Sequence, residues 1–285
     1  MTLLTKVVPP NLPIAKDEFT RLDEEYFRNV LRLYFNQLSQ LVNNLAGGTG
    51  GQYLQFPYGA FHQDGTTTLS TGITNVSTTP IVVASTAGFP SSGWILIGSE
   101  IIQYTTKTDT TFDGTITRVA LGTSQAAHSA GVAISEVQGT GSSTTIGTVL
   151  FNNTDYSNGV YASADYTKVY FSYSGIYNLQ LSAQLLNYTT TEDNVTIWLR
   201  KNGTDVSASA GIVEVSPKHG TAPGAYIAAW NYFLDLAAGD YVQLVWTSDT
   251  GNSVIATYPA STSPVHPASP GLIFTAQFIS APPEA

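Results

Sequence analysis

The sequence predicts a mainly β protein with one helix near the N-terminus, and three observations support this fold class. Only 11% of the 285 residues are charged, against roughly 25% in an average soluble domain. Thr, Ser, Gly, Tyr and Val take the place of charged residues, a composition that suits half-buried strands joined by tight turns. The C-terminal half also alternates apolar and polar side chains with a period of two, which is typical of strands with one buried face.

Charge and cysteine content exclude several classes of function. The chain has no cysteine, so disulfides and thiolate metal sites are excluded. The formal net charge is −9, and basic and acidic residues balance within residues 1–50, so the negative charge belongs to the remainder. Because an acidic body repels phosphate groups, we expect no direct binding of nucleic acid.

The first residues show no apolar core of signal-peptide length, and no stretch of the chain is long enough to span a bilayer. We therefore expect synthesis in a cytoplasm and no membrane insertion. This context makes glycosylation unexpected at the two acceptor-type triplets that begin at Asn194 and Asn202.

Residues 1–51 are predicted to form an extended arm followed by a helix. The early "VVPPNLP" lacks amide donors at its prolines, which excludes helix and central strand. Asp17 is the predicted N-cap, and "GGTGG" (47–51) ends the helix in a glycine joint. The helix carries a heptad seam formed by Phe27, Leu31, Tyr34, Leu38, Leu41 and Leu45.

Two arrangements of this helix are open. It can lie on its own domain, or it can join copies from other chains in a short bundle. The sustained heptads and the glycine joint favour the bundle, because the joint uncouples the helix from the body.

From about residue 144 the chain reads as strand after strand. Alternation over 177–185 predicts a strand with one buried face. The stretch "NVTIWLRKNGTD" (194–205) predicts a hairpin, since Asn202-Gly203 suits a type I′ turn that needs positive φ at both positions. Further strands are predicted over 228–236, 241–247, 254–258 and 272–279.

Several of these segments resemble one family. "YSGIYNLQLSAQL", "VTIWLRKNGTDV", "AAWNYFLDLAAGDYVQLVW" and "PGLIFTAQFI" resemble the TNF-like jelly roll of complement-q-type heads and of similar heads on bacteriophage fibre and virion structural proteins. "PYGAFHQDGTTTL" (57–69) and "TVLFNNTDYSNGV" (148–160) are similar to the phage versions. The resemblance implies a trimeric jelly-roll sandwich, while for function it is an analogy, because one fold hosts many functions.

In those relatives the last two segments follow each other almost directly, whereas here residues 72–141 intervene. We expect this segment to be an inserted small β-module, with a hairpin around Gly98-Ser99. The jelly-roll head then comprises 52–71 and 142–285. The alternative is two domains in series with the second starting near 144, and the split resemblance favours the insertion.

The sequence gives no sign of catalytic chemistry. The four histidines, His62, His128, His219 and His266, have no second metal ligand at helical spacing. No nucleophile elbow, phosphate loop or dinucleotide fingerprint is present. We therefore expect no enzyme activity, catalytic residue, cofactor or metal site.

Aromatic residues are dense in the predicted head. They suit a core and a subunit interface or, alternatively, a platform that faces sugar or protein; their strand positions favour the former. The interface candidates are Tyr177, Trp198, Trp230, Tyr232, Tyr241 and Trp246.

The resemblance implies a homotrimeric structural protein of a bacteriophage virion, made in the host cytoplasm, as a surface fibre, spike or capsid decoration. Residues 1–46 would bind other virion proteins, and a host-surface glycan or protein is a further expected partner. An internal tail or adaptor component is the alternative within this class. A polysaccharide-degrading tailspike is the alternative from another class, although the repeats of a β-helix are absent.

Overall fold

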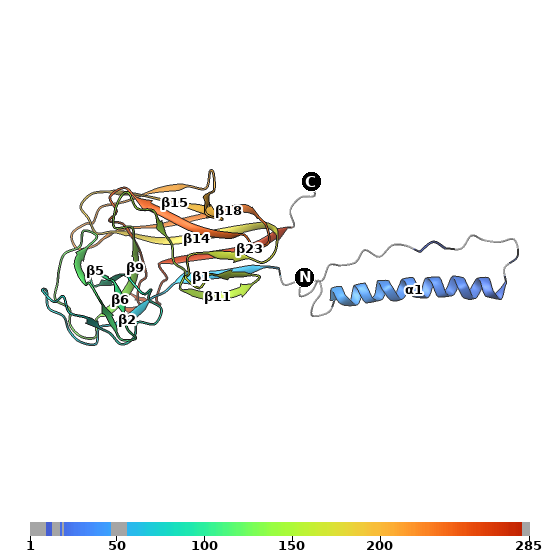
Figure 1. The fold of residues 1–285 in the computed structure, drawn as a ribbon, viewed down its shortest axis with the longest axis horizontal. Helices are drawn as coiled ribbons and strands as arrows, with labels where there is room; N and C mark the ends of the chain where they lie inside the picture. The colour runs from blue at the N-terminus through green and yellow to red at the C-terminus, as the bar shows by residue number, and fades with distance from the viewer. Residues whose placement is uncertain (1–9, 13–17, 19, 47–55, 281–285) are drawn as a thin grey trace. The chain divides into compact units, whose positions relative to one another are not determined.

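The computed structural model describes residues 10–12, 18, 20–46 and 56–280. The chain divides into two compact units, the first ending at Phe56 and the second beginning at Pro57. The described residues contain one helix and 23 strands, which confirms the mainly β class (Figure 1). No helix in this part of the chain is long and apolar enough to cross a membrane.

The helix α1 (Arg21–Ala46) begins with a capping box. Thr20 Oγ1 accepts a hydrogen bond from the Asp23 amide at 3.3 Å, and the Asp23 carboxylate accepts one from the Thr20 amide at 3.1 Å. Two donors at the helix start are thereby paired. The predicted cap, Asp17, lies outside the described residues, and Thr20 fills that role.

The second unit contains two antiparallel sheets that pack on one core (Figure 1). Sheet I consists, in spatial order, of β11 (Asn153–Asn158), β1 (Tyr58–Gln63), β23 (Leu272–Ser280), β14 (Gly175–Asn187) and β18 (Gly224–Leu236). Sheet II consists of β12 (Val160–Ala162), β13 (Val169–Phe171), β19 (Tyr241–Ser248), β15 (Asp193–Lys201) and β17 (Gly211–Val215). The short β10 (Gly147–Thr148) pairs with β19, and β16 (Thr204–Asp205) pairs with β15.

The core between the sheets is built from the apolar alternate positions of these strands, as the alternation over 177–185 predicted. Its largest fully buried side chains are aromatic: Phe61, Phe151, Phe171, Tyr177, Trp246 and Phe274. The hairpin prediction is also confirmed, because Arg200 pairs with Asp205 across the turn. Asn202 and Gly203 have φ values of 50° and 83°, as a type I′ turn requires.

The segment between β1 and β10 has a core of its own. It contains β2 (Thr66–Thr68), β3 (Ile81–Val82), β4 (Gly93–Ile97), β5 (Glu100–Tyr104), β6 (Thr106–Lys107), β7 (Thr111–Asp113), β8 (Thr117–Ala120) and β9 (Ala133–Gly139). The expected hairpin around Gly98-Ser99 joins β4 to β5. A separate hydrophobic cluster, formed wholly within residues 69–134, includes Ile81, Tyr104 and Phe112.

This segment is joined to sheet I by hydrogen bonds and by apolar packing. Strand β9 pairs with β20 (Val254–Ala256), which pairs in turn with β14, so the sheet continues from the head into the segment. Leu96 and Ile101 from the segment pack with Leu186 and Tyr188 from the head. The boundaries 72–141 stay a prediction. Where the segment meets the head, side chains of the two parts pack on each other. The short pair β21 (Ser261–Thr262) and β22 (Val265–His266) completes the strands.

A buried ionic network holds the segment's loops. The Glu100 carboxylate accepts hydrogen bonds from Arg118 Nε at 2.6 Å and Nη2 at 2.7 Å, and His128 Nε2 lies 2.9 Å from it. Arg118 also donates to the carbonyls of Thr74 and Ala126. Burial alone raises the pKa of Glu100, but the hydrogen bonds from Arg118 and His128 outweigh it and hold that pKa below its usual value.

Replacing Arg118 by Met should destabilise the protein by about 3–5 kcal/mol, because the Glu100 carboxylate would stay buried without its partner. Urea denaturation measures the free energy of unfolding. The matched control is Arg200→Met, which breaks the partly exposed pair between Arg200 and Asp205 and should cost about 1 kcal/mol or less. Equal costs for the two variants would show that the buried network contributes no special stability.

Candidate functional site: the outer face of sheet I

The outer face of sheet I is formed by the alternate positions of β14, β18 and β23 that point away from the core. The strand register places their side chains in rows. Asn178 lies between Phe233 and Gln277, and one row further Gln180 lies between Asn231 and Thr275. In the next row, Ser182 lies between Ala229 and Ile273.

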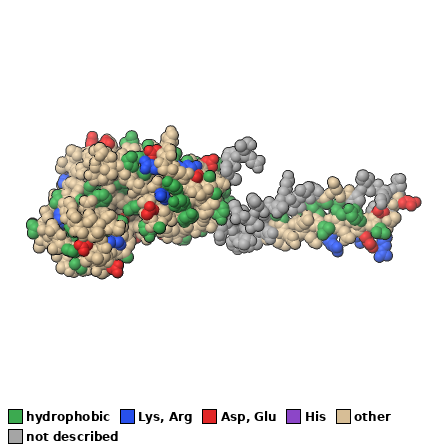
Figure 2. Space-filling view, viewed as in Figure 1, with side chains coloured by type: hydrophobic (Ala, Val, Ile, Leu, Met, Phe, Trp, Pro, Cys, Tyr) green, Lys and Arg blue, Asp and Glu red, His purple; other side chains and the backbone are tan. Residues whose placement is uncertain are grey.

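This face is nearly free of charge. The sequences of the three strands contain one charged residue, Asp235. The face nevertheless exposes four large apolar side chains: Ile227 (66% exposed), Phe233 (62%), Ile273 (42%) and Ile279 (47%). Single exposed apolar residues are ordinary, but several on one nearly uncharged face are typical of a surface that contacts another protein. Figure 2 shows that charged side chains are sparse on the visible face of the body as a whole.

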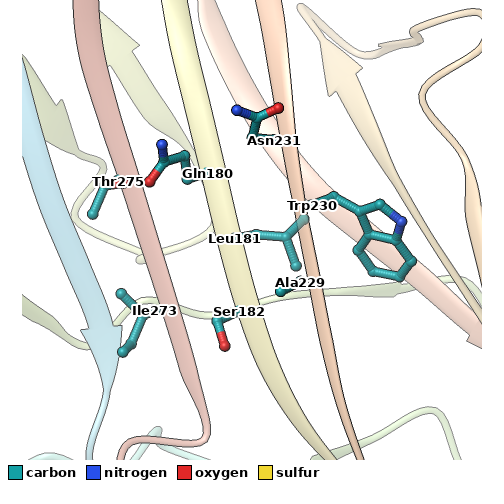
Figure 3. Close-up of a pocket in the computed structure, with 8 residues that line it drawn as sticks. All are labelled: Gln180, Leu181, Ser182, Ala229, Trp230, Asn231, Ile273 and Thr275. Carbon is teal, nitrogen blue, oxygen red and sulfur yellow. The ribbon is translucent and has the colours of Figure 1, made fainter.

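A shallow depression of about 390 Å³ lies on this face. Figure 3 shows its lining: β14 contributes Gln180, Leu181 and Ser182, β18 contributes Ala229, Trp230 and Asn231, and β23 contributes Ile273 and Thr275. The small side chains of Ser182 and Ala229 leave the hollow between larger neighbours. None of the eight lining residues is an acid, a base or a thiol, so the depression offers shape and hydrogen bonds rather than acid–base chemistry.

Strand β18 is an edge strand thirteen residues long, and β14 is its only paired strand among the described residues. Next to this edge lies β17 of sheet II. The Trp230 indole packs so closely on Gly211 that a side chain there would clash, and the Tyr232 hydroxyl donates a hydrogen bond to the Ser209 carbonyl. These aromatic contacts tie the two sheets together. Lys201 Nζ also donates a hydrogen bond to the Asp235 carbonyl of β18 at 2.9 Å, but among the described residues no second strand pairs with this edge.

The structure corrects two of the predicted interface residues. Tyr177 is fully buried and Trp246 is 1% exposed within a single chain, so neither can contact a neighbouring subunit. Both occupy inward positions of their strands and belong to the core between the sheets. The alternation of Tyr177 with Leu179 already indicated this inward direction. Trp230 and Tyr232 are partly buried against the same core, and only Trp230 lines the depression.

The other two aromatic candidates lie on the outer face of sheet II. Trp198 is partly buried and stands opposite Val245 in the strand register. Tyr241 belongs to a row of three tyrosines. The ring centroids of Tyr241 and Tyr170 lie 5.4 Å apart, and those of Tyr170 and Tyr161 lie 5.5 Å apart. The six candidates therefore do not gather at one site.

The predicted helix seam follows one stripe of α1. Its members Phe27, Leu31, Tyr34, Leu38 and Leu41 are partly buried. Large apolar side chains outside the seam are more exposed, among them Leu22 at 79% and Leu33 at 60%. The side chain of Leu45 lies outside the described residues. Self-association through this stripe stays a prediction.

The histidines lie apart from one another. His62 Nδ1 lies 3.1 Å from an oxygen of Asp155, and His128 belongs to the Glu100 network. His219 and His266 are exposed. Across the described ranges, no group of three or more His, Cys, Asp or Glu side chains is arranged to hold a metal ion.

Two buried carboxyl groups, one in the head and one on β9 of the segment, behave differently. Asp193 accepts hydrogen bonds from the Ser248 hydroxyl at 2.5 Å and from the amides of Thr250 at 2.9 Å and Ser253 at 3.0 Å. Burial opposes ionisation, but these bonds outweigh it and lower the pKa of Asp193, which marks a structural anion. For Glu136 the balance is reversed, and burial raises the pKa to about 8.

Comparison with known proteins does not assign a function to these features. No protein-family model matches the sequence. A search of curated proteins gives no match either.

The raised pKa of Glu136 predicts how stability depends on pH. An unfolded glutamate ionises near its ordinary pKa of 4.5, whereas the folded one stays protonated up to about pH 8. The free energy of unfolding should therefore fall as pH rises through this window, by on the order of 5 kcal/mol at most. Glu136→Gln should remove this part of the pH dependence in urea denaturation at several pH values. The control Glu214→Gln, at an exposed position of β17, should retain it; identical profiles for the two variants would contradict the assignment.

Proposed function

We propose that this chain is a homotrimeric, non-enzymatic structural protein of a bacteriophage virion, acting as a surface fibre, spike or capsid decoration. In this proposal the N-terminal arm and helix attach the protein to the particle, and the β unit is a TNF-like jelly-roll head that projects outward. The observation that carries the proposal is the nearly uncharged outer face of sheet I, whose exposed apolar side chains favour contact with a partner surface.

The strand connections support a jelly-roll head. The chain passes from sheet II to sheet I between β13 and β14, returns to sheet II at β15, and crosses again at β18 and β19. Strands from the two ends of the unit also meet, since Gln63 of β1 pairs with Leu272 of β23. Such long-range antiparallel pairings are typical of the Greek keys from which jelly rolls are made. The sequence resemblance then supplies the analogy with heads of phage structural proteins.

The position of the apolar residues supports self-assembly around an axis. Ile227 and Phe233 lie on the edge strand β18, whereas Ile273 and Ile279 lie on β23, on the far side of β14. If the edge of one copy packs against the face of the next, the contact is heterologous, and a three-fold rotation between copies closes it as a ring. From strand dimensions, the three-strand face measures about 40 by 14 Å, or roughly 600 Å². With the edge added, it approaches the roughly 800 Å² per partner of a stable interface.

Antibody access and sugar release distinguish the proposed role from its two alternatives. An internal tail or adaptor component would share the trimeric head but would not be reached by antibodies on intact particles. A polysaccharide-degrading tailspike, the alternative from another class, would release reducing sugar from host capsule. In the proposed role, no such release occurs.

Light scattering tests the assembly. At micromolar concentration the protein should have about three times the chain mass of 30.4 kDa. Phe233→Arg should reduce the mass to that of one chain, because a charge would be buried without a partner in the interface. The control Val265→Arg replaces an apolar residue that is 86% exposed on β22 and should leave the trimer intact. A wild-type monomer would refute the trimer, and a trimeric Phe233→Arg variant would refute this face as the interface.

Truncation tests the proposed anchor. Because the unit from Pro57 onward is compact by itself, deleting residues 1–46 should leave a folded trimeric head with an unchanged melting temperature. Purified virions assembled with the truncated protein should lack it, as immunoblotting would show. Normal incorporation of the truncated protein would place the anchor elsewhere in the chain.

A further inference from the structure

A second cavity, of about 570 Å³, lies between the module and the head. Its wall comes from segments far apart in the sequence: the loop 88–91, Lys107 of β6, Glu136 of β9, residues 150, 152 and 153, and the turn 164–166. All of them belong to one chain and to one compact unit. The cavity shares no lining residue with the depression on the outer face of sheet I.

A buried carboxyl group with one unpaired oxygen forms part of this wall. The Glu136 side chain is fully buried, and its Oε2 accepts a hydrogen bond from Asn152 Nδ2 at 2.6 Å. Its Oε1 makes no hydrogen bond. The Gln63 side chain lies close enough to Glu136 to lower its pKa, although burial outweighs this effect. Buried polar atoms are nearly always paired, and an unpaired one costs free energy. In the cavity wall, Glu136 therefore keeps one carboxyl oxygen that can still form a hydrogen bond.

Asn152 fixes the position of this carboxyl group. Besides Glu136, its amide donates to the Gly88 carbonyl, and its Oδ1 accepts a hydrogen bond from the Asp64 amide at 3.1 Å. The side chain thus links the module loop, the head and Glu136. Such support from the surroundings holds a binding group in place before a ligand arrives.

The turn at the rim presents an aromatic ring. Tyr166 is 47% exposed although it lines the cavity. Its φ of 59° is in the left-handed region, which a bulky residue rarely adopts. Two hydrogen bonds hold the turn, from the Tyr166 amide to the Ser163 carbonyl at 2.9 Å and from the Phe151 amide to the Tyr166 carbonyl at 3.0 Å. Backbone strain of this kind is concentrated at ligand sites.

We propose that this cavity binds one sugar residue of a glycan, with the Tyr166 ring against an apolar face of the sugar and Glu136 hydrogen-bonded to a hydroxyl group. The inference rests on the proposed virion role only for the source of the sugar, which would be the host surface.

The chemistry of the wall favours a neutral, hydroxylated ligand over other classes. Burial keeps Glu136 protonated at neutral pH, so it offers one donor and one acceptor, as a hydroxyl group requires. The ammonium group of Lys107, whose Nζ donates to the Thr86 carbonyl at 2.8 Å, disfavours a cation. Asp165 at the rim disfavours an anion. A purely apolar ligand would leave the Glu136 oxygen unpaired. The volume lies within the range of small-ligand sites.

Saturation-transfer-difference NMR tests the proposal on the full chain, with the methyl glycosides of glucose, galactose, mannose, N-acetylglucosamine and N-acetylgalactosamine as probes. At least one glycoside should receive saturation from the wild-type protein. Tyr166→Gly removes the ring while keeping a residue that tolerates positive φ, so the variant should fold and raise the Kd of that glycoside about tenfold. The control Tyr156→Ala changes a tyrosine that is 68% exposed outside the cavity and should leave the Kd unchanged.

Two results would overturn the proposal: no saturation transfer to any of the five glycosides, or equal affinity in wild type and in folded Tyr166→Gly. Light scattering on the same samples separates this test from the assembly. A monomer that binds sugar would refute the proposed trimer and keep the sugar site. A trimer that binds none of the glycosides would refute the sugar site and keep the proposed trimer.

Discussion

Strand β14 is the element on which the head depends, because it carries hydrogen-bonded partners on both sides. It pairs over its whole length with β18 on one side, and with β23 and then β20 on the other. One set of its alternate side chains, including Tyr177 and Leu181, fills the core. The other set must face outward, since successive side chains of a strand point to opposite faces. The outer face, which is nearly free of charge, is therefore built on the same strand that organises the core.

The same strand connects the head to the module. The C-terminal end of β14 pairs with β20, and β20 pairs in turn with β9. Strand β9 contributes Glu136 to the cavity between the two parts. Apolar packing of Leu96 and Ile101 from the module against Tyr188 of the head closes this junction. A module joined in this way moves with the head, so a ligand held at their boundary would contact two parts whose relative position the sheet fixes. The buried pair of Glu100 and Arg118 acts within the module and stabilises its loops.

Much of the local structure could be predicted from the sequence, because it depends on neighbouring residues. The period of two located the strands, and Asn202-Gly203 located a turn whose φ values only certain residues tolerate. The helix start was misplaced, since several residues near it are suitable caps and the choice of Thr20 depends on its reciprocal bonds with Asp23. Two of the six interface candidates were wrong for a different reason. Aromatic type was used to choose them, whereas direction along the strand decides exposure, so Tyr177 and Trp246 are in the core while Phe233 is outside. The cavity beside Glu136 is lined by residues far apart in the chain, so no local sequence pattern predicts it.

The central claim is that the outer face of sheet I is covered by other copies of the same chain. A cryo-electron microscopy map of the purified full-length protein tests it most directly. The account predicts three heads around one axis, with β18 of each copy against the β14 and β23 strands of the next, and with Phe233 and Ile273 buried between copies. A map of single heads, or of heads joined through the tyrosine row of sheet II with the face of β14, β18 and β23 open to solvent, would contradict it.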